Sequence, residues 1–131
     1  MEVEVELSKI IINEAVDQQI IVLKELEGER SFPIVIGMTE ILAIDRRLKN
    51  IQLPRPMTHD LLENVIDQIG GEVQKVVIND LSNGTFYARL HINLDGETVE
   101  VDSRPSDAIA LGVGVGAPIF VDEQVFGNMQ M

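Results

Sequence analysis

The chain has 131 residues, 45% of them hydrophobic, which is enough for one globular domain that buries about two thirds of its extended-chain surface. It carries 22 acidic and 10 basic residues, and the net charge of -12 disfavours binding of nucleic acid by bulk attraction. The absence of cysteine excludes a thiol nucleophile, a disulfide and cysteine-bound zinc. The sequence shows neither a basic, apolar leader nor a run of about 20 apolar residues, so we expect a cytoplasmic protein with no membrane partner.

The first part of the chain predicts three strands followed by a helix. Glutamates alternate with apolar side chains over residues 2–7, which indicates a strand with one buried face. Further strands are expected over residues 19–26 and 32–36, with a glycine-containing turn between them. A helix then begins with Thr39 as its N-cap, and Leu53-Pro-Arg-Pro56 prevents its continuation.

A second helix is predicted from Thr58, as N-cap, to the Gly70-Gly71 pair. We expect one face of this helix to be buried, because five apolar side chains share it: Leu61, Leu62, Val65, Ile66 and Ile69. Burial of each such side chain contributes about 1.5–3 kcal/mol before entropy is subtracted. The helix is therefore expected to serve mainly in packing.

Three consecutive strands follow, over residues 72–81, 85–94 and 97–102. They are joined by Asn83-Gly84 and by Asp95-Gly96, the dipeptides that favour two-residue type I′ turns. The sequence therefore predicts a three-stranded antiparallel meander.

The turns also determine which side chains face each other across this meander. The second turn places His91 opposite Glu100 and Arg89 opposite Asp102, and the first turn places Arg89 opposite Ile78 on the neighbouring strand. The charged pairs are either structural ion pairs, each worth about 0.2–1 kcal/mol, or the margin of a functional site.

A third helix is predicted to begin with Ser106 as N-cap and to be ended early by the glycines at 112, 114 and 116. A last strand over residues 117–121 follows. We expect the domain to span residues 1–126 and residues 127–131 to form a frayed tail.

The predicted fold class is α+β: a single compact domain with mixed, mostly antiparallel sheets and about three helices. Leu26-Glu-Gly-Glu29 matches Leu94-Asp-Gly-Glu97, and Thr39-Glu-Ile-Leu-Ala43 matches Ser106-Asp-Ala-Ile-Ala110, at offsets of 68 and 67 residues. The matches indicate either an internal duplication of a hairpin-strand-helix unit or the shared chemistry of turns and helix caps.

The first candidate site lies where the strand over residues 97–102 leads into the third helix. Asp102 and Asp107 could hold a divalent ion or activate water, while Arg104 binds a phosphate oxygen. The alternative is structural, because Ser106 at an N-cap and Asp107 in a first helical turn are what a helix start favours.

The second candidate site lies around the start of the second helix. Four of the ten basic residues fall within positions 46–55, and His59 lies just beyond them. His59 and Glu63 are four residues apart and share a helical face, so they could share a metal ion or a proton. Many solvated helices show the same spacing, so the structural role is the favoured alternative for His59 taken alone.

Two segments, Arg55-Pro-Met-Thr-His-Asp-Leu61 and Arg104-Pro-Ser-Asp-Ala-Ile-Ala-Leu111, with Pro118-Ile-Phe-Val121 after them, resemble the bifunctional nuclease domain family, also known as domain of unknown function 151. The resemblance covers about residues 23–126. It implies a compact α+β domain of a kind found in bacteria, with plant members that degrade DNA and RNA. The family's motif residues correspond here to Arg55, Thr58, His59, Asp60, Arg104, Ser106 and Asp107.

The resemblance implies a nuclease that hydrolyses phosphodiester bonds of DNA or RNA with the help of a divalent metal. The expected cofactor is Mg²⁺ or Mn²⁺, held by Asp102 and Asp107, and Arg55 and Arg104 are the expected phosphate-binding residues. The expected catalytic residues are His59, Asp60, Asp102 and Asp107. The alternative is a non-catalytic, homo-oligomeric ligand-binding or adaptor domain, which the net charge of -12 and the scarcity of aromatic residues favour.

Overall fold

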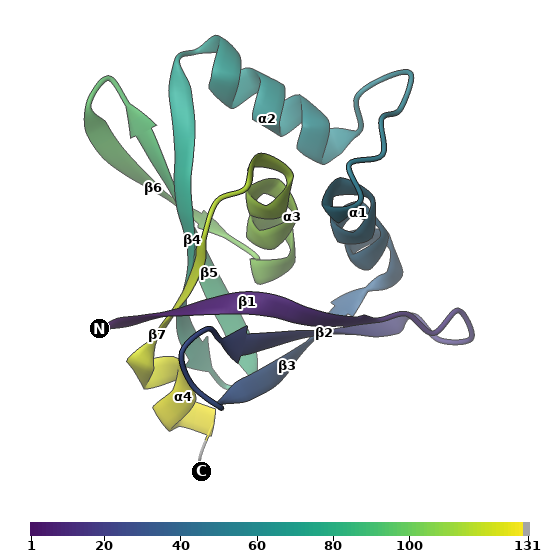
Figure 1. Cartoon of the computed structure of the whole chain (residues 1–131), viewed down its shortest axis with the longest axis vertical. Coiled ribbons are helices and arrows are strands. Elements are labelled where there is room, and N and C mark those ends of the chain that lie inside the picture. The colour runs from purple at the N-terminus through teal and green to yellow at the C-terminus, as the bar shows by residue number, and fades with distance from the viewer. Residues whose placement is uncertain (130–131) are drawn as a thin grey trace.

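In the computed structural model, which describes residues 1–129, one seven-stranded sheet bends around three helices, and a fourth short helix lies near the C-terminal end (Figure 1). The elements are, in chain order, β1 (Glu2–Ile11), β2 (Gln18–Glu25), β3 (Ser31–Gly37), α1 (Met38–Leu48), α2 (Thr58–Gln68), β4 (Gly71–Ser82), β5 (Thr85–Leu94), β6 (Glu97–Ser103), α3 (Pro105–Val115), β7 (Ile119–Asp122) and α4 (Glu123–Met129). The predicted α+β class is confirmed, with four helices within residues 1–129 in place of about three.

The sheet has the strand order β3-β2-β1-β7-β4-β5-β6, and its neighbours are antiparallel except for the parallel pair β4 and β7. Strands β1 to β3 lie across the lower part of Figure 1 and β4 to β6 run up its left side, with α1 to α3 in the angle between them. Each half is a meander followed by a helix, β1-β2-β3-α1 and β4-β5-β6-α3. A common origin of the two halves stays a prediction.

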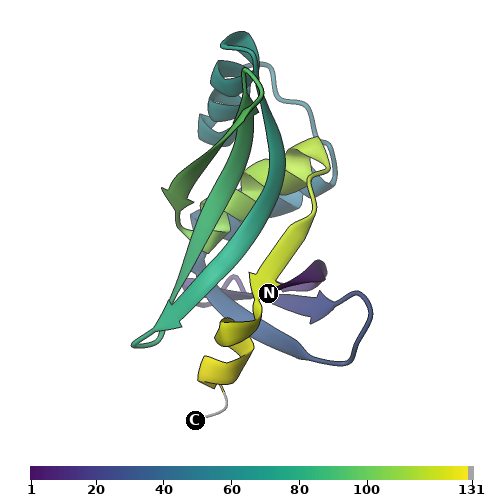
Figure 2. The same ribbon diagram turned by 90° about the vertical axis from the view of Figure 1, so that its left-hand side faces the viewer.

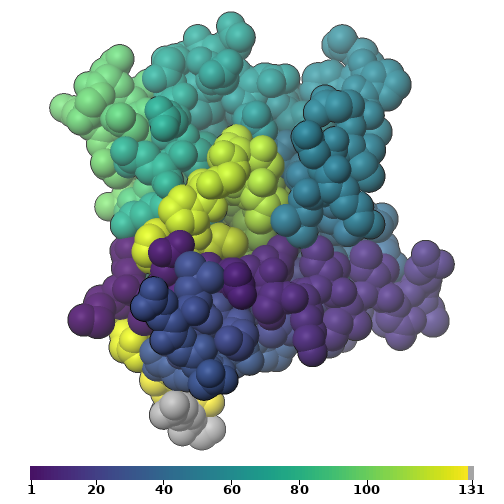
Figure 3. Space-filling model, viewed as in Figure 1, coloured from purple at the N-terminus to yellow at the C-terminus, as the bar shows by residue number. Residues whose placement is uncertain are grey.

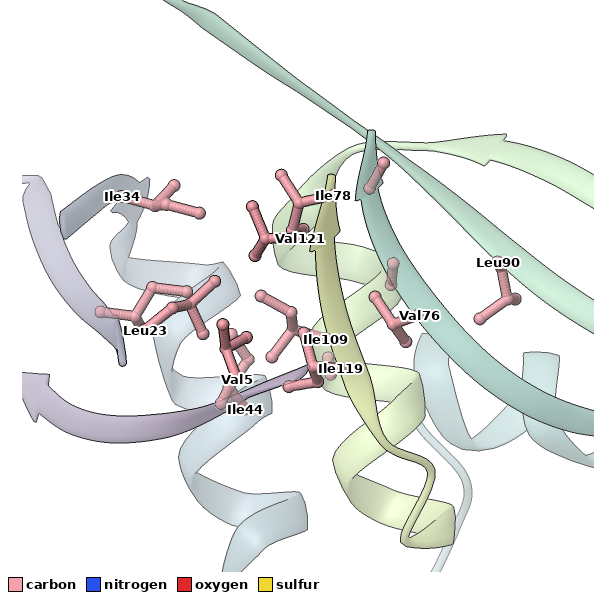
Figure 4. Packing of buried hydrophobic residues seen from close by; sticks show 14 of the residues in the cluster. Val5, Leu23, Ile34, Ile44, Val76, Ile78, Leu90, Ile109, Ile119 and Val121 are labelled. Atoms are coloured by element: carbon pink, nitrogen blue, oxygen red, sulfur yellow. The ribbon is translucent and has the colours of Figure 1, made fainter. Parts of the chain in front are cut away.

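Both halves of the sheet contribute to one core, which is centred on α3 (Figure 4). Val5 and Leu23 reach it from one half, Val76 and Leu90 from the other, and Ile109 of α3 lies between them with no exposed surface. Because α3 is built from small apolar residues, the strands can approach it closely. The outer face of β4 to β6 is turned away from α3, which lies behind these strands in Figure 2.

The predicted N-caps are wrong by one or two residues in all three cases. Thr39 is the second residue of α1, Thr58 the first of α2 and Ser106 the second of α3. In α3 the first position is taken by Pro105, whose fixed φ and missing N–H suit a helix start. Arg104 is therefore the N-cap of α3, and Ser106 is buried.

The glycines of α3 do not end the helix early, as the sequence had suggested. The helix continues to Val115 and ends at Gly116, which has a φ of 75° in the left-handed region. A Cβ on Gly112 would lie 2.7 Å from Cγ2 of Val76, and a Cβ on Gly114 would overlap the guanidinium of Arg47. Gly112 and Gly114 therefore allow close packing against β4 and α1.

The predicted register is right between β5 and β6, whereas between β4 and β5 it is right only next to the turn and is wrong by one residue from Ile78 to Lys75. His91 pairs with Glu100 and Arg89 with Asp102, as expected. Arg89 lies opposite Val77, and not opposite Ile78, because β4 is irregular between Ile78 and Asp80. A bulge of this kind shifts every later pair, and local turn chemistry does not predict it.

The apolar face of α2 is largely exposed, so the prediction of a buried face is wrong. Of the five apolar side chains only Ile66 is buried, whereas the exposed fractions are 55% for Leu61, 42% for Leu62, 47% for Val65 and 62% for Ile69. The helix contacts β4 and α3, and its polar residues Asp60 and His59 pair with Arg47 of α1 and Asp107 of α3. Its apolar stripe faces outward.

The C-terminal part of the chain forms an additional helix that the sequence analysis did not predict. Val125 and Phe126 of α4 are buried, and Phe126 packs edge-on against Phe32 at a centroid distance of 5.5 Å. Residues 127–129 of the expected tail belong to α4, and residues 130–131 lie outside the described residues. Within residues 1–129, every helix is too short or too polar to cross a membrane.

Candidate functional site

Residues from two segments that the sequence analysis treated as separate sites meet where α2 and α3 begin. Nε2 of His59 in α2 lies 3.0 Å from Oδ1 of Asp107 in α3. The other carboxylate oxygen of Asp107, Oδ2, accepts a hydrogen bond of 2.9 Å from Nε of Arg104. The structure therefore joins three predicted site residues, which lie up to 48 positions apart, in one chain of contacts.

The charges around Asp107 keep it ionised. Its partial burial acts to raise the pKa, but the hydrogen bonds from Arg104 and His59 outweigh this, and the pKa of the carboxyl is lowered. In turn, the hydrogen bond to Asp107 raises the pKa of Arg104. A carboxylate only accepts hydrogen bonds, so Nε2 of His59 is the donor here, and in a neutral imidazole Nδ1 then carries the lone pair.

Arg104 is held by Asp107 but remains open to solvent. Its side chain is 65% exposed, and Nη2 lies 3.6 Å from Oε2 of Glu40 in the first turn of α1. Since a guanidinium has five N–H donors, Arg104 retains donors for an anion. Glu40 is a member of this site that the sequence analysis missed, because its place in a first helical turn already had a structural explanation.

Asp60, the next residue of α2, belongs to a second cluster built on Arg47. Nη1 of Arg47 donates to Oδ1 of Asp60 at 2.7 Å, and Nη2 of Arg47 donates to Oε1 of Glu63. Arg46 adds an ion pair of 3.2 Å to Asp60. The expected partnership between His59 and Glu63 is therefore replaced by separate partners, Asp107 for the histidine and Arg47 for the glutamate.

Arg47 is the centre of this second cluster and is nearly buried, with a side chain only 5% exposed. Its Nε donates to the carbonyl oxygen of Ala110 at 2.6 Å, so one guanidinium links α1, α2 and α3. The sequence analysis missed this role, because arginine is rarely buried and the position only indicated a favourable helix end.

The carboxyl of Asp60 is also kept ionised. Partial burial acts to raise its pKa, but the hydrogen bonds from the backbone N–H of Met57 and from Arg46 and Arg47 outweigh this, and the pKa is lowered. The bond from Met57 has a length of 3.0 Å and satisfies a free donor at the start of α2. Asp60 thus holds the N-terminus of α2 against α1.

The two remaining predicted residues lie outside these clusters. Asp102 is exposed near the end of β6, opposite Arg89, and Arg55 is exposed in the loop before α2. Two cavities flank the clusters. One of about 570 Å³ is lined by Arg104 and Glu40, and one of about 300 Å³ is lined by Arg46, Arg47 and Asp60.

The donor set does not by itself fit the divalent ion expected at Asp102 and Asp107. Both carboxylate oxygens of Asp107 already have hydrogen-bonding partners. Within residues 1–129, no three histidine or carboxylate side chains form a group that could hold a metal ion. Mg²⁺ usually takes one or two carboxylates together with water and substrate phosphates, so the missing ligands would have to come from outside the protein.

Comparisons with known proteins place the chain in a family. The model of the bifunctional nuclease domain matches residues 21–131. The chain is 38% identical over 125 residues to an uncharacterised protein of Mycobacterium tuberculosis, which covers 95% of this chain and 74% of that protein. It is 30% identical over 112 residues to Bifunctional nuclease 1 of Oryza sativa subsp. japonica, covering 82% of this chain and 34% of the rice protein.

A further relative is Bifunctional nuclease 2 of Arabidopsis thaliana, which is 29% identical over 107 residues, covering 79% of this chain and 32% of the plant protein. The chain therefore belongs to the bifunctional nuclease domain family, as its two motif segments had indicated. It spans about a third of the length of these plant relatives.

Proposed function

We propose that the protein is a nuclease that hydrolyses phosphodiester bonds of DNA or RNA at the cluster of His59, Arg104 and Asp107. The observation that carries this proposal is the convergence of these three motif residues from α2 and α3. The cluster combines a proton acceptor, a carboxylate that orients it and a cation suited to phosphate. Membership of a family with plant relatives named bifunctional nucleases supports the reaction type.

The chemistry of the cluster follows from its hydrogen bonds. Asp107 holds Nε2 of His59, so Nδ1 takes a proton from water while the water oxygen forms a bond to phosphorus. The bond from phosphorus to the leaving oxygen breaks, and His59 returns the proton to that oxygen. The products are a phosphomonoester and an alcohol. Arg104 balances the charge on the non-bridging oxygens.

The metal requirement stays a prediction. A bound Mg²⁺ or Mn²⁺ ion would supply further charge for the phosphate and a more acidic water. Asp107 is its candidate ligand in the cluster. Asp102, which is exposed on β6, stays a predicted second ligand.

The test is digestion of single-stranded and double-stranded DNA and RNA by the wild type and by His59→Ala and Asp107→Asn. We expect each change to lower kcat/KM by roughly 10²–10⁴-fold, as loss of a positioned acid-base group does. His91→Ala is the matched control, because His91 faces Glu100 at 3.8 Å on the outer side of the sheet. Cleavage that persists in both site variants would contradict the proposal, and EDTA tests the metal prediction separately.

A second candidate function is a non-catalytic, homo-oligomeric ligand-binding or adaptor domain. The exposed stripe of Leu61, Val65 and Ile69 on α2 favours it, because apolar stripes of this kind usually mark interaction surfaces. Light scattering would detect the assembly, and Val65→Lys is expected to reduce its mass. Val35→Lys, at a valine of β3 that is also exposed, is the matched control. A wild type that is monomeric at all concentrations would contradict this candidate.

A further inference from the structure

The cavity of about 300 Å³ lies between the end of α1, the loop that follows it and the first turns of α2. This loop arches from α1 to α2 at the upper right of Figure 1. Gly114 of α3 also lines the cavity, and the C-terminal part of the chain, drawn in yellow, lies at the centre of Figure 3. Asp60 lines the cavity, and the preceding residue, His59, belongs to the cluster with Asp107. The cavity and the proposed active site are therefore connected through consecutive residues of α2.

The charged groups in the wall of this cavity compensate one another. Arg46 and Arg47 both pair with Asp60, and Arg47 also pairs with Glu63. Two cations and two carboxylates leave no net charge, so the wall does not favour an anionic or a cationic ligand by charge. The wall of the cavity can instead bind a ligand through hydrogen bonds.

Three amide side chains supply that hydrogen bonding, and apolar residues complete the lining. Asn50, Gln52 and Asn64 each carry a carbonyl acceptor and an NH₂ donor. Ile51 and Leu53 add apolar surface from the same loop. A flat, neutral ring with donors and acceptors along its edge fits this combination, and a nucleobase is such a ring.

The loop that carries Asn50 and Gln52 has a defined conformation. The backbone N–H of Asn50 donates to the carbonyl oxygen of Arg47 at 3.2 Å, and that of Ile51 donates to Arg46 at 3.1 Å. Asn50 has a φ of 53° in the left-handed region, which ends α1 and turns the chain over the cavity. Asn50 is therefore presented from an ordered turn at the end of α1, and Asn64 from the helix α2.

We propose that this cavity binds a nucleobase of the substrate and gives the nuclease a base preference. This inference rests on the proposed function, because it places the base beside a phosphate held at Arg104. The cavity and the cluster of His59, Arg104 and Asp107 are connected by adjacent residues of α2, since Asp60 lines the cavity and His59 contacts Asp107. Amide side chains recognise base edges through paired donors and acceptors, which makes Asn64 and Asn50 the specificity-determining residues.

The test uses free nucleosides, which lack phosphate, and measures their binding by NMR titration of the full chain without added metal. We expect one of adenosine, guanosine, cytidine and uridine to bind best and to shift amide signals over residues 46–53 and 60–64. Asn64→Ala and Asn50→Gly should each weaken binding about tenfold, the loss expected for one paired contact. Glycine at position 50 keeps the left-handed conformation. Gln68→Ala, at an exposed amide of α2 that does not line the cavity, is the matched control.

The two proposals fail in different ways. Nucleoside binding that is lost in Asn64→Ala supports the cavity even if the wild type cleaves no nucleic acid. Nucleosides that do not bind, or that bind equally well to the wild type and to Asn64→Ala, overturn the base site. If cleavage still depends on His59, the proposed nuclease function is unaffected by that result. Signals that shift only outside residues 46–64 also overturn it.

Discussion

At the scale of single residues, Arg47 contributes most to the arrangement of the site. It joins three helices through Ala110, Asp60 and Glu63, and Asp60 is the residue next to His59 in α2. The sequence shows several basic residues near the end of the first predicted helix, but it could not show that the side chain of Arg47 is the one that is buried. A buried guanidinium is stable here because each part of it has a carboxylate or carbonyl partner.

Arg47→Lys is expected to lower the free energy of unfolding by about 2 kcal/mol or more. A lysine keeps the charge but lacks the planar fork that donates to Asp60, Glu63 and Ala110 at once, so the buried carbonyl of Ala110 or a partly buried carboxylate loses its partner. Urea denaturation measures the change. Lys49→Arg, at the exposed end of α1, is the control and should change stability by less than about 0.5 kcal/mol. Equal stability of both variants would contradict the role of Arg47.

Asp60→Asn is expected to remove a part of the stability that depends on pH. The pKa of Asp60 is lowered from its ordinary value of 3.8, so its ionised form stabilises the fold above that pH, and this is lost as the pH falls through the lower, folded-state pKa. The variant should be about 1.5–3 kcal/mol less stable at pH 7, and the difference should shrink below about pH 4. Urea denaturation from pH 3 to pH 7 measures it, and a difference that is constant over this range would contradict the prediction.

At the scale of elements, α3 shows how packing can reverse an intrinsic helix preference. Alanine normally stabilises a helix interior relative to glycine by about 0.5–1 kcal/mol. In Gly114→Ala the added Cβ would overlap the guanidinium of Arg47, so we expect a net destabilisation of at least about 1 kcal/mol. Gly127→Ala in α4 is the matched control, because a Cβ there meets no atom within 4 Å and should stabilise the helix. Thermal unfolding measures both, and a stabilised Gly114→Ala would show that Arg47 moves aside freely.

The same scale shows which elements the sequence could predict. Glycine-containing turns and alternating side chains located the strands of both meanders, because these signals are local. The position of the second helix was also predicted correctly, but the side of the helix that is buried was not. Periodicity shows which residues share a face, and it cannot show that the inward face of α2 is the one with His59 and Asp60. That choice depends on partners in α1 and α3.

At the scale of the whole molecule, the negative charge limits how nucleic acid can bind. Only Arg55 and Arg104 were predicted as phosphate contacts, and the acidic strand β1 runs across the face shown in Figure 3. With about two phosphate contacts, affinity should fall only about tenfold between 50 and 200 mM salt, compared with 10³–10⁵-fold for proteins that make six to ten. The salt dependence of kcat/KM measures this. Arg55→Gln should flatten it further and Arg89→Gln, on the outer sheet face, should leave it unchanged.

The candidate site was only partly accessible to sequence reasoning. The motif segments located His59, Asp60, Arg104 and Asp107, and the resemblance to the family is confirmed by the match over residues 21–131. The sequence could not show that His59 and Asp60 belong to two different clusters, because adjacent residues of one helical turn contact different partners, Asp107 and Arg47. The strand order was equally inaccessible, since the pairing of β7 with β1 and β4 joins distant segments.

The position of β7 has a consequence for how the protein is made. Among the described strands, β7 alone is hydrogen-bonded to both meanders, with β1 on one side and β4 on the other. During synthesis the two meanders can each form early, but the sheet cannot close until residues 119–122 have left the ribosome. A nascent chain halted before that point exposes two open strand edges, and it depends on chaperones or on rapid completion to avoid aggregation.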